Sequence, residues 1–188
     1  MRTIGVMGAS ALPQEPEQRA RVLRLAELTG TAIAEADCAL ITGATTGIPH
    51  AVALAAQAAG GISIGISPAE NNTEHTKEYG LPTDAFDAII YTGFGLRGRN
   101  VVNVRSSDLI IVLGGGVGTL NEITIAWAER KLIGVVDVEP GLTTQIRCLI
   151  ETTNAPPMRV VTNSDPRALV EQCLKECRNN AQPRSGPP

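Results

Sequence analysis

A glycine-rich run near the middle of the chain carries the strongest chemical signal in this sequence. Four glycines fall within five positions and are followed by a threonine and an acid: Gly114, Gly115, Gly116, Gly118, Thr119 and Glu122. The apolar segment 109–113 before the run predicts a buried strand, and the segment 123–130 after it predicts a helix. A strand, a glycine turn and a helix together present free backbone N–H groups to an anion. We therefore interpret the run as a phosphate-binding loop. The alternative is a tight turn closed by a capping box between Thr119 and Glu122.

Glu122 is the acid held within this run, and two roles are open for it. In the first turn of a helix, the dipole and nearby N–H groups would keep its carboxylate ionised. Such a carboxylate could stabilise positive charge developing at an anomeric carbon, or orient a water molecule. The other role is the structural capping box. The residue type and its spacing favour neither role over the other.

Arginines that precede the same strand could supply positive charge to an anion. Arg97, Arg99 and Arg105 lie on a predicted helix, and Arg99 shares a helix face with Asn103 four residues later. A guanidinium group can hold phosphate or carboxylate through two hydrogen bonds. The alternative is that these arginines are solvated or paired with acids such as Asp108.

Polar and glycine residues also follow two other predicted strands. They are Gly8 and Ser10 after the strand 3–7, and Gly43, Thr45 and Thr46 after the strand 39–42. Their hydroxyls suit phosphate or hydroxyl ligands, although turn formation explains them nearly as well. Of the two histidines, His75 in a polar loop is a better functional candidate than His50, which lies near the start of an apolar helix.

Short apolar runs alternate with helical stretches, which predicts a Rossmann-like α/β fold: a doubly wound parallel sheet with helices on both faces. Strands are expected at 3–7, 39–42, 61–66, 88–91, 109–113, 131–136 and 159–162, and helices at 17–36, 48–59, 97–106, 123–130, 142–152 and after Pro166. Asp165 predicts an N-cap for the last helix, with Pro166 in its first position. The long polar segment 67–87 is typical of lids, binding loops or disorder.

These elements predict one Rossmann-like nucleotide- or phosphate-binding domain at 1–178 and a disordered tail at 179–188. Because ligands of open α/β sheets bind at the carboxyl ends of the strands, we expect the three glycine-bearing turns to meet there. The helix 48–59 has almost no polar face, which predicts a homodimer or homotetramer packed through this helix and the helix that contains Trp127.

Composition argues against several other classes of protein. A formal net charge of −3 gives no general attraction to nucleic acid. The four cysteines form no C-x-x-C pair and the two histidines lie far apart, so we expect reduced thiols and no metal site. Neither an apolar run of about twenty residues nor a signal peptide is present. We therefore expect a cytoplasmic protein with no membrane partner and no required cofactor.

The combined motifs resemble the Lonely Guy family, whose pattern is Arg-Lys, a strand, and then Pro-Gly-Gly-x-Gly-Thr-x-x-Glu. The matching segments are Arg99-Asn100, 105–108 and 115–122, together with 42–47, 51–53, 60–61 and 65–68. This resemblance covers roughly residues 3 to 137 and implies a Rossmann-like fold, at least a dimer, and a site for a phosphorylated nucleoside. In the family's enzymes the residues matched by Arg99 and Glu122 are catalytic. They cleave the N-glycosidic bond of cytokinin riboside or adenosine monophosphates, releasing the base and ribose 5-phosphate.

Several positions depart from that pattern. Gly114 replaces the proline, Asn100 replaces the lysine, and 95–98 lacks the usual Met-His pair. The segments 74–75, 79–80 and 91–99 instead resemble a sister branch, the fourth SLOG cluster. That branch includes proteins similar to the molybdenum cofactor carrier, which bind a phosphorylated pterin without turnover.

Three functional hypotheses follow. The first is an oligomeric carrier or binding protein for a phosphorylated nucleotide-like ligand, with molybdenum cofactor as a candidate cargo. The second is a phosphoribohydrolase of nucleoside 5′-monophosphates, with Arg99 and Glu122 as its catalytic residues. The third is a nucleotide-sensing module. The expected ligand-binding residues are Gly8, Ser10, Gly43, Thr45, Thr46, Arg99, Gly114, Gly115, Gly116, Gly118, Thr119 and Glu122.

Overall fold

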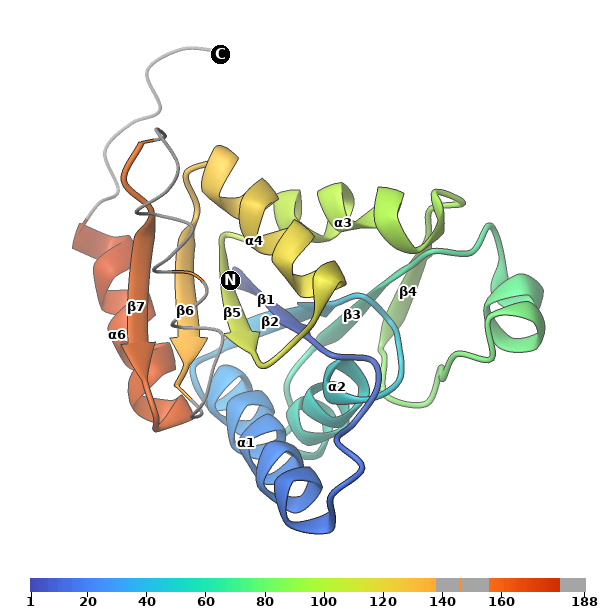
Figure 1. Ribbon diagram of the computed structural model, residues 1–188, viewed down its shortest axis with the longest axis horizontal. Helices are drawn as coiled ribbons and strands as arrows, with labels where there is room; N and C mark the ends of the chain where they lie inside the picture. Colours follow the sequence, from blue (N-terminus) through green and yellow to red (C-terminus); the bar gives the residue numbers. More distant parts are fainter. Residues whose placement is uncertain (138–145, 147–155, 180–188) are drawn as a thin grey trace.

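A seven-stranded sheet, parallel throughout, forms the centre of the molecule (Figure 1). The computed structural model describes residues 1–137, 146 and 156–179. Its strands are β1 (Arg2–Gly8), β2 (Cys38–Thr42), β3 (Ser63–Ser67), β4 (Ala88–Tyr91), β5 (Leu109–Leu113), β6 (Leu132–Val136) and β7 (Arg159–Asn163). The order across the sheet is β4-β3-β2-β1-β5-β6-β7. The predicted Rossmann-like α/β fold is confirmed.

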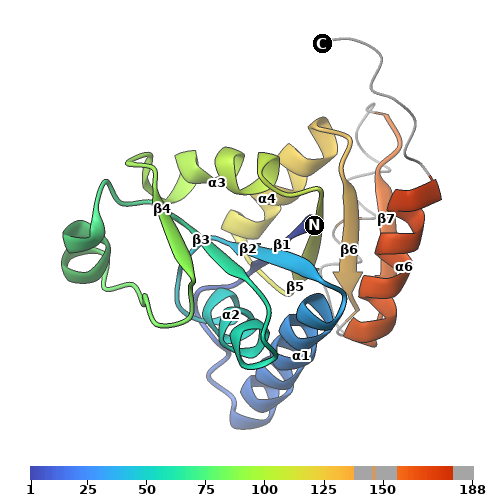
Figure 2. The same cartoon turned by 180° about the vertical axis from the view of Figure 1, so that it is seen from behind.

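Helices cover both faces of this sheet, as Figures 1 and 2 show from opposite sides. They are α1 (Pro16–Glu35), α2 (Ile48–Ala58), α3 (Gly95–Arg105), α4 (Val117–Ala128) and α6 (Pro166–Asn179), with the short π-helix η1 (Glu74–Glu78) between β3 and β4. The first residue of the predicted tail, Asn179, belongs to α6. The rest of that tail, and the predicted helix 142–152 apart from Ile146, lie outside the described residues.

The strand β5 shows why the apolar pattern of the sequence predicted the sheet correctly. Its side chains alternate between two cores: Leu109, Ile111 and Leu113 pack on the side of α1, α2 and α6. Ile110 and Val112 pack on the side of α3 and α4. A strand covered on both faces must be apolar at every position, as this one is. At the start of α6, the Asp165 carboxylate accepts a hydrogen bond of 2.9 Å from the Arg167 backbone N–H, which confirms the predicted N-cap.

The strand order places three predicted turns side by side. From β1 the chain builds outward through β2 to β4, then returns to β5 on the other side of β1 and builds outward again. The carboxyl ends of β2, β1 and β5 are therefore neighbours. The reversal lies between β1 and β5, which is the position where open α/β sheets form a ligand crevice.

The apolar helix α2 packs against α1 and the sheet of its own chain, and part of its surface remains exposed. A Cβ atom at Gly30 of α1 would collide with the backbone oxygen of Val52, so the two helices approach closely where a side chain is absent. Among the large apolar side chains of α2, Leu54 alone is exposed, at 40%. The Trp127 indole likewise donates a hydrogen bond of 2.7 Å to the Pro156 carbonyl oxygen. The homo-oligomer packed through α2 and the helix that contains Trp127 stays a prediction.

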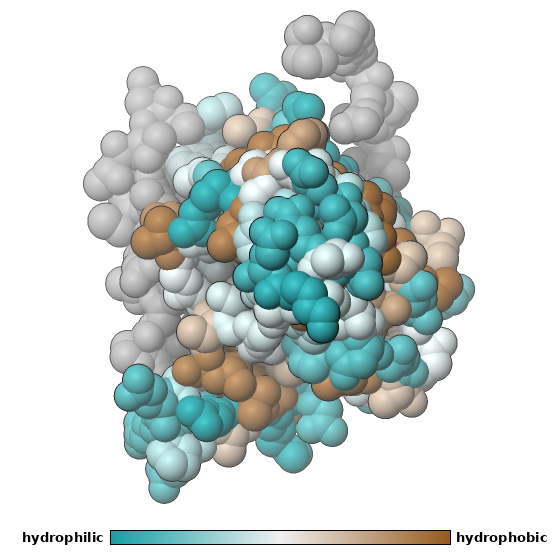
Figure 3. Space-filling view, turned by 90° about the vertical axis from the view of Figure 1, so that its right-hand side faces the viewer, coloured by the Kyte–Doolittle hydropathy of each residue, from teal (hydrophilic) through white to brown (hydrophobic). Residues whose placement is uncertain are grey.

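The polar segment 67–87 projects from one side of the sheet and carries η1. Figure 3 shows this side of the molecule, with hydrophilic side chains gathered where η1 projects toward the viewer. No helix within the described ranges has both the length and the apolar character that crossing a membrane requires.

Candidate functional site

A cavity of about 350 Å³ opens where the carboxyl ends of β1, β2 and β5 meet the first turns of α3 and α4. Its volume is that of a small-molecule site. Its walls comprise Gly8, Ala9, Ser10, Ala11, Thr45, Leu96, Arg97, Arg99, Asn100, Gly116, Val117, Gly118, Thr119 and Glu122. Most of the residues predicted from the sequence lie in this set, so the fold brings together what the three turns carry separately.

Four of the predicted residues shape the cavity without lining it. Gly43 lies under the Arg99 guanidinium, and a Cβ atom at Gly43 would collide with it. The Thr46 hydroxyl donates a hydrogen bond of 3.0 Å to the Ser10 carbonyl oxygen and so ties the second turn to the first. Gly114 and Gly115 turn the chain between β5 and α4 with φ angles of +59° and +129°. These residues position the walls of the site.

The glycine turn ends in an open helix N-terminus. Gly116 is the N-cap of α4, and no side chain caps the helix. The capping box proposed between Thr119 and Glu122 is wrong, because such a box needs the threonine at the N-cap and the cap lies three residues earlier. The backbone N–H groups of the first turn therefore have no intrahelical partner, which is the arrangement that binds anions.

Arg99 and Glu122 form a buried pair on the floor of the cavity. The Arg99 Nη1 atom lies 3.3 Å from Glu122 Oε1, and the two residues are 7% and 6% exposed. The Asn103 side-chain amide donates a hydrogen bond of 2.9 Å to the same carboxylate oxygen. The Nε atom of Arg99 is buried and has no hydrogen-bond partner within the part of the chain that the structure describes. The guanidinium therefore keeps hydrogen-bonding capacity for a ligand.

Burial dominates the electrostatics of this pair. It raises the pKa of the Glu122 carboxyl above the usual value, against the opposing effect of Arg99 and of the hydrogen bond from Asn103. Burial also lowers the pKa of the Arg99 guanidinium, against the stabilising charge of Glu122. The expectation that the helix N-terminus sets the ionisation of Glu122 is wrong. Glu122 lies in the second turn of α4, where the loss of hydration raises its pKa more than Arg99 and Asn103 lower it.

The raised pKa of Glu122 predicts a pH dependence of stability. Between the ordinary glutamate pKa of 4.5 and the raised pKa of the folded state, the native state holds this proton where the unfolded chain has released it. The contribution of Glu122 to the free energy of unfolding therefore falls as pH rises. Glu122→Gln lacks this contribution, so in urea denaturation its stability should improve relative to wild type as pH rises above the ordinary glutamate pKa of 4.5. A difference that is constant, or that moves the other way, would contradict the assignment.

Six residues of the cavity wall were not among the residues predicted to bind a ligand: Ala9, Ala11, Leu96, Arg97, Asn100 and Val117. Leu96 of α3 and Val117 of α4 both line the cavity and are 47% and 76% exposed. Arg97 lies between Leu96 and Arg99 in the chain. Its proximity to Arg99 was visible in the sequence, but its side-chain direction depends on how α3 meets α4. Arg105 instead pairs with Glu129 at 2.7 Å on the surface.

The two histidines have structural partners away from this cavity. His75 is fully buried. Its Nε2 atom donates to the Pro82 carbonyl oxygen at 3.0 Å, and its Nδ1 atom accepts from the Ser67 hydroxyl at 2.8 Å. These two hydrogen bonds anchor the segment 67–87, so the functional role suggested for His75 is not supported. His50 lies 2.9 Å from Asp84, and this hydrogen bond lowers the pKa of the Asp84 carboxyl.

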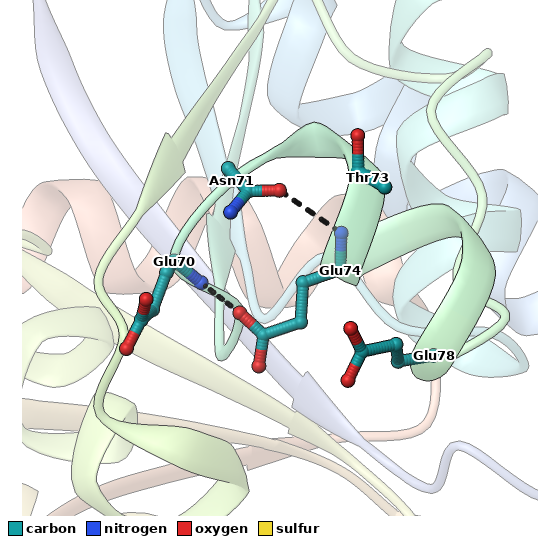
Figure 4. Close-up of a pocket in the computed structure, with 5 residues that line it drawn as sticks. All are labelled: Glu70, Asn71, Thr73, Glu74 and Glu78. Carbon is teal, nitrogen blue, oxygen red and sulfur yellow. Dashed lines mark hydrogen bonds between the residues drawn. The ribbon is translucent and has the colours of Figure 1, made fainter.

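A second depression, of about 590 Å³, lies beside η1 (Figure 4). It is lined by Glu70, Asn71, Thr73, Glu74 and Glu78. The Glu74 carboxylate accepts a hydrogen bond of 2.6 Å from the Glu70 backbone N–H, so part of this cluster holds the turn. Three carboxylates repel an anion, so this depression does not suit a phosphate group. Across the described residues, no group of three His, Cys, Asp or Glu side chains is arranged to hold a metal ion.

Two solved structures resemble the whole of this arrangement. The molybdenum cofactor binding protein from the phototrophic bacterium Rippkaea orientalis is 31% identical, with a TM-score of 0.73, and the match covers 93% of this chain and 96% of that one. The molybdenum cofactor carrier protein of Chlamydomonas reinhardtii is 27% identical, with a TM-score of 0.70 and coverage of 93% and 98%.

An enzyme also shares part of the sequence. The cytokinin riboside 5′-monophosphate phosphoribohydrolase of Mycobacterium tuberculosis is 36% identical over 114 residues, which is 60% of this chain and 58% of that enzyme. The model of the SLOG cluster4 family matches residues 1–170, a range that includes all seven strands and every residue of the cavity. With the sheet order, the glycine turn and the Arg99–Glu122 pair now described, this match shows that the chain belongs to the SLOG cluster4 family.

Proposed function

We propose that this protein binds a phosphorylated, nucleotide-like small molecule in the cavity between α3 and α4, as a carrier or binding protein without turnover. One observation carries the proposal: the uncapped N-terminus of α4 and the buried guanidinium of Arg99 line the same cavity. Backbone N–H groups at a helix start and a guanidinium fork are both suited to phosphate oxygens.

Molybdenum cofactor is the candidate cargo that we propose first. The two solved relatives described above are named for binding or carrying it, and its pterin carries a phosphate. The exposed apolar side chains of Leu96 and Val117 at the cavity mouth offer contacts to a ring system. In this arrangement the phosphate lies at Gly116–Thr119 and the ring lies toward the mouth.

The second candidate is a nucleoside 5′-monophosphate phosphoribohydrolase, and the buried Arg99–Glu122 pair is the observation that favours it. In that reaction the bond between the anomeric carbon and the base breaks, and its electron pair leaves with the base. Water adds to the carbon and the base gains a proton. The Glu122 carboxylate would stabilise the positive charge on the sugar, with Arg99 holding that carboxylate in place.

Titration with AMP, followed by analysis of the same samples for adenine, tests both candidates. We expect calorimetry to show that AMP binds more than about tenfold tighter than adenosine, because a phosphate held by charged and N–H donors contributes more than a kilocalorie per mole. We expect no release of adenine. Absence of AMP binding would contradict the proposed function.

Release of adenine would favour the hydrolase instead. In that case Glu122→Gln should lower turnover by about two orders of magnitude or more while AMP still binds. Glu129→Gln is the matched control, since Glu129 lies on the same helical segment but pairs with Arg105 on the surface. Turnover that survives Glu122→Gln would remove Glu122 from the catalytic role.

A further inference from the structure

Arg97 lies over the start of α4 at the mouth of the cavity. An ideal Cβ atom built on Gly118 would be 2.9 Å from Arg97 Nη1, so the guanidinium rests against the backbone of the first turn. This close approach is possible because Gly118 has no side chain that would displace the Arg97 guanidinium. Arg97 also lines the cavity, beside Gly116 and Thr119.

Arg97 differs from its neighbours on α3 in having no acidic partner. Arg99 pairs with Glu122 and Arg105 pairs with Glu129, at 3.3 Å and 2.7 Å. Within the described residues, Arg97 forms neither an ion pair nor a side-chain hydrogen bond. Its exposed guanidinium therefore keeps both its charge and its donors available at this position.

The charges around the cavity do not balance without an anion. The charge of Glu122 offsets that of Arg99, and the positive end of the α4 dipole and the charge of Arg97 are then left over. Arg97 is close enough to lower the pKa of both Glu122 and Arg99. The Nε atom of Arg99 is buried and has no acceptor among the described residues, so a second donor in the same cavity is unpaired.

We propose that Arg97 is a specificity-determining residue that selects a terminal phosphate monoester over a phosphodiester or a neutral nucleoside. This inference rests on the proposed function, since it concerns the same cavity. A monoester presents three terminal oxygens and carries a charge of about −1.5 to −2 at neutral pH. The backbone N–H groups of α4 take one side of the phosphate and the Arg97 fork takes the other. In a diester, one of these oxygens carries a substituent and one charge is lost, so the contact with Arg97 is lost.

The test compares Arg97→Gln with wild type in calorimetric titrations of two probes, AMP and adenosine 5′-(methyl phosphate). Arg105→Gln is the matched control, an exposed arginine on the same helix that lies outside the cavity. We expect wild type to favour AMP and Arg97→Gln to weaken AMP about tenfold, the scale of one charge-assisted hydrogen bond. Binding of the methyl ester should change less than about twofold, and Arg105→Gln should leave both affinities unchanged.

Several results would overturn this inference. If Arg97→Gln weakens both probes equally, or if it weakens neither, Arg97 does not select the monoester, while AMP binding by wild type still supports the proposed function. If wild type does not bind AMP, the proposed function and the role of Arg97 are both wrong. Because Arg97 is exposed and unpaired, its replacement should leave the melting temperature unchanged, so a loss of affinity is not explained by unfolding.

Discussion

Replacing Arg99 with methionine should lower the free energy of unfolding by about 3 kcal/mol, because it leaves a buried carboxylate without its cation. The methionine side chain cannot donate a hydrogen bond to Glu122. The remaining hydrogen bond from Asn103 does not offset the free-energy cost of the buried charge. Urea denaturation at neutral pH measures the effect. Arg105→Met is the control, since it breaks the exposed pair with Glu129 and should cost about 1 kcal/mol or less.

The double variant Arg99→Met with Glu122→Gln separates the cost of the unpaired charge from that of lost packing. Removing both charges avoids an uncompensated carboxylate, so the double variant should be more stable than Arg99→Met alone. A double variant whose loss equals the sum of the two single losses would show that the two residues are not coupled as their geometry implies.

Replacing Gly115 with alanine should weaken AMP binding about a hundredfold, the scale that a displacement of about an ångström costs in a preorganised site. Gly115 has a φ of +129°, a conformation that L-residues rarely adopt, and a Cβ atom here would collide with the Thr119 side chain. The turn must then shift, and the first N–H groups of α4 shift with it. Calorimetric titration with AMP measures the loss.

Gly60→Ala is the control for this variant. Gly60 also has a positive φ, +76°, but no atom lies within 4 Å of a Cβ built on it. It lies between α2 and the start of β3, at the amino ends of the strands and away from the cavity. It should cost about 1 kcal/mol of stability through backbone strain and leave AMP affinity unchanged. Equal AMP affinities for wild type and Gly115→Ala would rule out this turn as the phosphate site.

Local sequence determined much of this protein. A strand covered on both faces has to be apolar throughout, and a parallel connection has to carry a helix, so the apolar run 109–113 and its counterparts predicted the sheet. Asp165 with Pro166 marked the start of α6 because a cap acts within one turn of chain. The glycine run likewise marked the turn after β5, because glycine adopts positive φ angles without steric cost, as Gly114 and Gly115 do here.

The tertiary structure alone decided how far polar groups and helix faces are buried. The sequence of α2 predicted burial on all sides but not by what; the structure shows that α1 packs across one side of it, because Gly30 lets the two backbones meet. The sequence motif suggested that Thr119 and Glu122 form a cap, but the helix begins earlier and turns Glu122 inward against Arg99 and Asn103. Spacing along the chain sets which residues share one helix face. The tertiary structure determines which strands are neighbours and which helix covers them. That packing determines how much hydration a carboxylate loses, and the loss of hydration raises its pKa.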